Sequence, residues 1–94
     1  MASYGYCEVT FIWERGVDHF RFISALGLPD ELIDSFPWEY HSQLGNQTFK
    51  TPEPFGHPVW FANHVGRAGW MFAGMTEDSG ATTTVRRYSF TKRR

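Results

Sequence analysis

The side chains best suited to chemistry in this chain are one cysteine and four histidines. Cys7 could act as a nucleophile if a histidine base lay beside it. The histidines are His19, His41, His57 and His64. Cys7, however, shares one side of an alternating stretch with Val9 and Phe11, and burial raises a thiol pKa and lowers its reactivity. We therefore expect Cys7 to be a core residue and the chain not to be an enzyme.

The histidines could also ligate a metal, helped by Glu39 or Glu53. None of them has the close spacing of structural zinc ligands, and there is no second cysteine. The glycines do not form a phosphate-binding loop followed by Lys-Ser or Lys-Thr. We expect no metal and no cofactor, and a Cys/His-dependent or metal-dependent enzyme is the third interpretation.

Aromatic residues form the second candidate group, with nine Phe, four Tyr and four Trp in 94 residues. Several lie in segment 38–60, which three prolines stiffen, and Trp and Tyr are common in interface hot spots. The candidate partner-binding residues are Trp38, Tyr40, His41, Phe55, His57 and Trp60. The alternative for Trp38 and Phe55 is that they fill the ends of the core.

Basic residues near the C-terminus form the third group. With an aromatic ring between them, they could bind single-stranded nucleic acid by phosphate contacts and base stacking. The candidates are Arg86, Arg87, Tyr88, Lys92 and Arg93. The alternative is a solvated strand end followed by a tail, since the chain lacks an RNP consensus and a Gly-x-x-Gly clamp.

Charge is divided unevenly along the chain. Residues 1–47 contain seven acids and two bases, whereas residues 48–94 contain three acids and seven bases. Opposite charges on the two halves, together with a free edge strand, would allow a homodimer.

A lone cysteine, no basic region followed by an apolar run at the N-terminus, and no long apolar stretch predict a cytoplasmic protein with no membrane role. The length predicts one domain, which we place at residues 1–91, followed by a basic tail at 92–94.

The elements expected to position these residues begin with a strand at 6–13, where apolar and polar residues alternate. Apolar residues at three-residue steps from Val17 to Leu26 predict a helix that begins at Asp18 and ends at Gly27. Pro29 and Pro37 bound a second, short helix.

Segment 38–58 is predicted to be irregular, with at most a short strand at 47–50. Three antiparallel strands should follow, at 59–65, 70–75 and 82–91. The predicted fold class is α+β, a single antiparallel sheet of four to five strands in the order strand, helix, helix, strand, strand, strand, with the helix pair packed on one face.

These features favour a small non-catalytic protein-binding module that acts by stoichiometric binding through an aromatic loop. Its protein partner is not identified by the sequence, and a single-stranded nucleic-acid-binding protein is the alternative. In size and aromatic content the chain is similar to small phage-encoded inhibitors and toxin-immunity proteins, and an adaptor would share these properties. This is a likeness of class and assigns no residue a role.

Overall fold

A computed structural model describes residues 4–16, 20–44, 47–55 and 57–93, with side chains described for all of these except residues 4 and 39–55. The elements in chain order are β1 (Tyr4–Glu14), β2 (Arg21–Leu26), α1 (Asp30–Asp34), β3 (Glu39–Leu44), β4 (Gln47–Phe55), α2 (Pro58–Gly66), β5 (Met71–Ser79) and β6 (Thr83–Arg93). The protein is a mixed α+β fold, as predicted.

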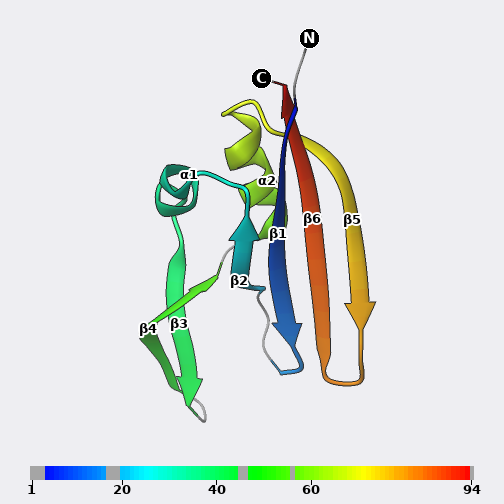
Figure 1. Cartoon of the computed structure of the whole chain (residues 1–94). Coiled ribbons are helices and arrows are strands. Elements are labelled where there is room, and N and C mark those ends of the chain that lie inside the picture. The colour runs from blue at the N-terminus through cyan, green and yellow to red at the C-terminus, as the bar shows by residue number, and fades with distance from the viewer. Residues whose placement is uncertain (1–3, 17–19, 45–46, 56, 94) are drawn as a thin grey trace.

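The six strands of the described residues form one antiparallel sheet with the order β3-β4-β2-β1-β6-β5 (Figure 1). β1 pairs with β6 along its whole length, from Tyr4 opposite Arg93 to Glu14 opposite Thr83. The β3–β4 hairpin joins the other four strands through a single pair, Arg21 opposite Phe55. The single antiparallel sheet is therefore confirmed, whereas the described residues form six strands instead of four to five, and the predicted order of elements along the chain is wrong.

The two faces of the sheet follow from the alternation along β1. Cys7, Val9 and Phe11 point to the face that the helices cover, which we call the helix face. Glu8 and Thr10 point to the opposite face, which we call the open face. Residues directly opposite each other in an antiparallel ladder share a face, so the ladder extends this assignment to β6 and β5.

The core lies between the helix face and the two helices. Its buried residues are Cys7, Val9, Phe11, Leu28, Phe36, Phe61, Val65, Trp70 and Phe90. His64 joins the helices, because its Nε2 lies 2.9 Å from the carbonyl oxygen of Leu32, which can only accept a hydrogen bond. Two helices on one face were predicted, but one of the two comes from a different segment.

The predicted helix from Asp18 to Leu26 is wrong: the described part of this segment is strand β2, and Val17, Asp18 and His19 lie outside the described residues. Ser24 lies opposite Thr10 and Phe22 opposite Phe11, so the register shifts at Ile23. This bulge turns both Phe22 and Ala25 to the helix face. The apolar stripe that predicted a helix is therefore not the inward side of this segment, because two of its members, Ile23 and Leu26, are 49% and 72% exposed.

Gly27, where the predicted helix was expected to end, has a left-handed conformation with φ of 82°. It ends a strand rather than a helix. A Cβ at this position would collide with the carbonyl oxygen of Tyr6, so the close approach of the chain to β1 requires glycine. The predicted short second helix is confirmed as α1, with Asp30 and Glu31 in its first turn.

Two further predictions are corrected. Segment 38–58, predicted to be largely irregular, contains the β3–β4 hairpin, and segment 59–65, predicted to be a strand, is helix α2. The last two predicted strands are present as β5 and β6 and are antiparallel neighbours. β6 continues through Lys92 and Arg93, two of the three residues assigned to the basic tail.

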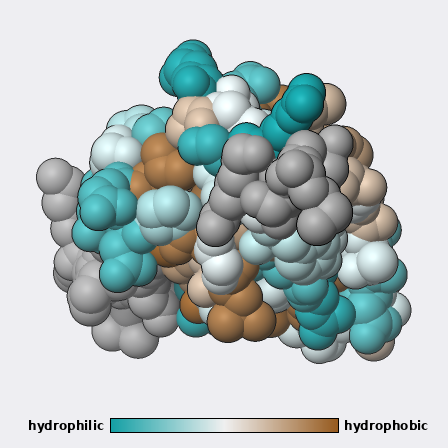
Figure 2. Space-filling view, turned by 45° about the horizontal axis from the view of Figure 1, so that its top comes forward, coloured by the Kyte–Doolittle hydropathy of each residue, from teal (hydrophilic) through white to brown (hydrophobic). Residues whose placement is uncertain are grey.

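The helices cover the sheet unevenly. Figure 1 places α2 over β1 and β2 and α1 beyond β2, whereas β5, at the opposite edge, approaches α2 only at its upper end. Large hydrophobic side chains consequently reach the surface, and Figure 2 shows such patches between hydrophilic residues. None of the helices in the described part of the chain is long and apolar enough to cross a membrane.

Candidate protein-binding surface

Helix α2 starts at a well-defined cap. His57 is the N-cap, and its Nδ1 accepts a hydrogen bond of 3.2 Å from the backbone N–H of Val59. Pro58 follows in the first turn, where a missing N–H has no cost. The helix ends at Gly66, and the N–H of Arg67 donates to the Asn63 carbonyl.

The two sides of α2 have opposite environments. Pro58, Phe61 and Val65 are buried against the sheet at the spacing of a helical stripe. Facing away from the core are His57, Val59, Trp60, Asn63 and Arg67, all of them exposed. We call these five residues the α2 outer surface.

Trp60 is the largest apolar group of the α2 outer surface. It is 65% exposed, whereas its chain neighbour Phe61 is 1% exposed. The Trp60 ring centroid lies 6.0 Å from that of His57, and Val59 beside it is 56% exposed. The helix thus fixes an indole and an aliphatic side chain on a rigid element while both remain accessible.

Trp38, another candidate from the sequence, is placed differently. Its Nε1 donates a hydrogen bond of 2.7 Å to the Ile33 carbonyl, and its ring stacks on Phe61 with centroids 5.4 Å apart. Contacts with Phe11, Phe22 and Phe36 complete its surroundings. Trp38 therefore closes one end of the core, which is the alternative that the sequence left open.

Three more candidates lie on the β3–β4 hairpin. Tyr40 is opposite Pro54, Phe55 is opposite Glu39, and His41 lies where the register of the hairpin shifts. Their side chains are outside the described residues. Of the six partner-binding candidates, the described side chains bring together His57 and Trp60 and separate Trp38 from them.

The basic candidates are divided between the two faces of β6. Arg86 and Tyr88 lie on the helix face, opposite Phe11 and Val9, while Arg87 lies on the open face, opposite Thr10. By the same alternation Lys92 belongs to the helix face and Arg93 to the open face. These side chains therefore do not form one continuous row.

Two of the cations on β6 have acidic partners. Arg86 Nε lies 2.7 Å from Glu77 Oε1, and its guanidinium lies over the Phe20 ring at 4.7 Å. The hydrogen bond to Glu77, followed by that to Tyr88, raises the pKa of Arg86. Arg87 Nε lies 4.0 Å from Glu8 Oε1. Part of the positive charge is thus balanced within the fold.

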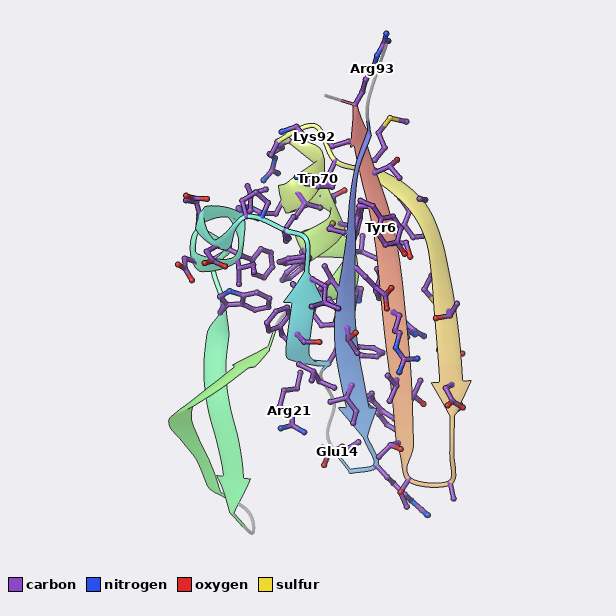
Figure 3. The ribbon with its side chains drawn as sticks, in the orientation of Figure 1. Tyr6, Glu14, Arg21, Trp70, Lys92 and Arg93 are labelled. Carbon is purple, nitrogen blue, oxygen red and sulfur yellow. The ribbon has the colours of Figure 1, made fainter. Side chains whose placement is uncertain are left out.

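Lys92 and Arg93 lie at the upper end of the sheet, beside the C-terminus. Figure 3 shows Lys92 near Trp70, with its Nζ 6.0 Å from the Trp70 ring centroid. Arg93 is exposed and projects from the end of β6. This end of the sheet is therefore positively charged.

Cys7 is fully buried in the core, as predicted. The pKa of its thiol is raised from an ordinary value of 9.0 to about 11, because desolvation outweighs the opposing effect of a hydrogen bond with the Phe90 backbone. Among the described residues there is no group of three or more His, Cys, Asp and Glu side chains that could hold a metal. His19 and the side chain of His41 lie outside those residues.

Sequence reasoning missed Val59, Asn63 and Arg67, because the β-branched and aromatic residues of 59–65 resembled a strand. The signals for a helix were present: a proline directly after a capping residue, and apolar residues at 58, 61 and 65. These positions would have put Trp60, Asn63 and Arg67 on one outward stripe.

No protein-family model, curated protein or solved structure matches this chain. Its function is therefore argued from the geometry above.

Proposed function

We propose that this protein is a non-catalytic module that binds a protein partner through the α2 outer surface, with Trp60 as the anchor. The observation that carries the proposal is the 65% exposure of Trp60 on a helix whose opposite side is fixed in the core. A tryptophan held on a rigid element loses little conformational freedom on binding.

The composition of the surface supports a protein partner. Trp and Arg are enriched in interface hot spots, and Trp60 and Arg67 lie on the same outward stripe, seven residues or about 10 Å apart along the helix. Asn63 between them supplies an amide that can both donate and accept hydrogen bonds. An apolar anchor with polar neighbours is the usual composition of a binding patch.

The surroundings of Cys7 support binding over nucleophilic catalysis. A reactive cysteine needs an accessible thiolate near a positive group. Cys7 lies between Val9 and Phe90 in the core, and burial raises its pKa to about 11. A non-catalytic protein of this kind would act by stoichiometric binding, as an inhibitor or an adaptor does.

Single-stranded nucleic-acid binding is the competing proposal, and the ladder gives it less support. A stacking platform needs accessible rings and cations on one face. Arg86 and Arg87 point to opposite faces, and Tyr88 is half-buried between the rings of Phe11 and Phe72. A strand of nucleic acid bound to either face would contact only some of the candidate rings and cations.

The test is affinity capture from a lysate of the native host with the wild type, Trp60→Ala, and Leu26→Ala as the matched control. Leu26 is another exposed large apolar residue, but it lies on β2. We expect a protein captured at near-equal stoichiometry by the wild type and by Leu26→Ala, and lost with Trp60→Ala. Circular dichroism should show the same fold for all three.

Nuclease treatment and high salt separate the two proposals. Capture through phosphate contacts weakens steeply as salt rises, so a ligand lost to nuclease and to salt would replace the protein-binding proposal with the nucleic-acid proposal. Equal capture by the wild type and by Trp60→Ala would remove the α2 outer surface from the mechanism.

A further inference from the structure

The free edge of the sheet at β5 is unusual in its side chains. β5 pairs with β6 on one side and with no described strand on the other. Met71, Phe72 and Met75 on this strand are 71%, 60% and 44% exposed. Natural edge strands are normally protected by charge, proline or a covering element, because a long apolar edge invites pairing with another strand.

Phe72 and Met75 lie on the same face. Phe72 is opposite Phe90 and Met75 is opposite Tyr88, so both point to the helix face, beyond the part that the helices cover. The Phe72 ring contacts the rings of Phe90 and Tyr88 at 6.1 and 6.4 Å. The core thus continues outward along β5 as an uncovered apolar ledge, formed by Phe72 and Met75.

The two ends of this edge carry opposite charges. Near the end of β5, Glu77 forms an ion pair with Arg86 within the fold, so the acid left to face a partner is Asp78. At its start, the Lys92 side chain lies beside Gly69, with Cε 3.4 Å from the position of a Cβ there, and Arg67 precedes it in the chain. Arg93 projects from the neighbouring strand at the same end (Figure 3).

We infer that the β5 edge is the interface of a symmetric homodimer in which β5 pairs antiparallel with β5 of a second copy. An antiparallel pair about a two-fold axis places the acidic end of each edge beside the basic end of the other. The occupant is therefore a second copy of this chain, because the edge complements itself in charge. This inference goes beyond the proposed function and does not rest on it.

The same symmetry joins the apolar ledges. The two-fold axis of an antiparallel pair is perpendicular to the sheet, so the helix faces of both copies lie on the same side. Phe72 and Met75 of the two copies then form one continuous apolar surface, and the exposed backbone of β5 gains hydrogen-bond partners. The six described strands of each copy then form one continuous sheet.

Asp78 and Arg93 give the sharpest test of this geometry. Asp78 is opposite Val85, and Arg93 is eight residues further along β6, about 26 Å away within one copy. This exceeds the distance over which exposed charges interact in physiological salt. Both residues belong to the open face, so in the register that sets Phe72 opposite Met75 of the second copy, the backbones of Asp78 and the other copy's Arg93 lie two strand spacings or about 10 Å apart. The long arginine side chain can span this gap and reach the carboxylate.

The experiment measures the mass of the full chain by sedimentation equilibrium across the micromolar to millimolar range. We expect a monomer–dimer equilibrium for the wild type. Asp78→Arg and Arg93→Asp should each weaken dimerisation by about tenfold or more, because each places like charges together twice in the dimer. An equimolar mixture of the two variants should recover a 1:1 heterodimer, since both contacts become attractive again.

The matched control is Asp34→Arg, a charge reversal at an exposed position on α1, which should dimerise like the wild type. Met75→Lys should weaken the dimer through the apolar ledge, independently of the charge pair. A monomer at every concentration, an open-ended polymer, or a mixture that fails to recover the heterodimer would each overturn the inference.

Discussion

β1 and β5 belong to the same sheet and both carry large apolar side chains on the helix face, but their environments are opposite. Cys7, Val9 and Phe11 of β1 are covered by the helices, whereas Phe72 and Met75 of β5 are not. β1 has a paired strand on each side, whereas β5 is an edge. The comparison shows that the position of the helices, and not the residue types of a strand, decides whether its apolar side chains form core or surface.

The largest expected difference between β1 and β5 is the loss of stability when one aromatic ring is removed from each strand. Phe11→Ala should lower the free energy of unfolding by about 3–5 kcal/mol, because Phe11 contacts Phe22, Phe61 and Tyr88 in the core. Phe72→Ala should lower it by less than about 1 kcal/mol. Urea denaturation of dilute protein measures both, and equal losses would contradict the division into covered and uncovered parts.

The next largest difference in stability is expected between substitutions of two glycines, one packed against β1 and one on the edge strand β5. Gly27→Ala should cost about 1–3 kcal/mol, because φ is 82° and the new Cβ would meet the Tyr6 carbonyl oxygen. Gly74→Ala on β5 is the control, since nothing lies within 4 Å of a Cβ there. Thermal unfolding should show a lower midpoint for Gly27→Ala alone, and a Gly74→Ala midpoint equally reduced would place β5 in the covered part.

Substitutions of two tryptophans, one buried against the core and one exposed, should show the same difference with a smaller change in the free energy of unfolding. Trp38→Phe should lower the free energy of unfolding by about 0.5–1.5 kcal/mol, because the Ile33 carbonyl loses its hydrogen bond from Nε1. Trp60→Phe should leave the stability unchanged, since Trp60 projects from α2 into solvent. Urea denaturation monitored by circular dichroism tests both, and a stability loss in Trp60→Phe would show that α2 depends on its outer surface for folding.

The last prediction concerns Cys7, whose ionisation has no effect on stability at neutral pH and lowers it at alkaline pH. Its folded-state pKa of about 11 lies above the ordinary 9.0, so from pH 9 to 11 the unfolded chain loses the thiol proton while the folded chain keeps it. The contribution of the Cys7 thiol to the free energy of unfolding should therefore be fully present below pH 9 and should be lost as pH rises toward 11. Urea denaturation at several pH values should show a steeper decline for the wild type than for Cys7→Ala, and parallel declines would mean that the thiol is not desolvated.

Much of the fold could be read from local sequence. The alternation around Cys7 gave β1 and its buried face, and the prolines around α1 gave that short helix. β5 and β6 were expected as neighbours because a turn-forming stretch separates two β-prone segments. The helix predicted at β2 was wrong because pairing with β1, including the bulge at Ile23, decides which residues of 20–26 face the core, and nothing within the segment signals that pairing.

The candidate site was predicted only in part. The sequence drew attention to His57 and Trp60, but treating 59–65 as a strand concealed their common surface with Arg67. Trp38 was included because an exposed and a buried tryptophan look the same in a sequence. The division of Arg86 and Arg87 between two faces, by contrast, follows from the period of two along any strand.

By itself, the sequence determined which segments have two sides and where the chain turns, because alternation, proline and glycine act over a few neighbouring residues. The tertiary structure alone decided which apolar sides are covered. That depends on where α1 and α2 settle on the sheet and on which strand is left at its edge, and both are set by contacts between residues far apart in the chain. The exposed indole of Trp60 and the open β5 edge are the two consequences on which the proposals rest.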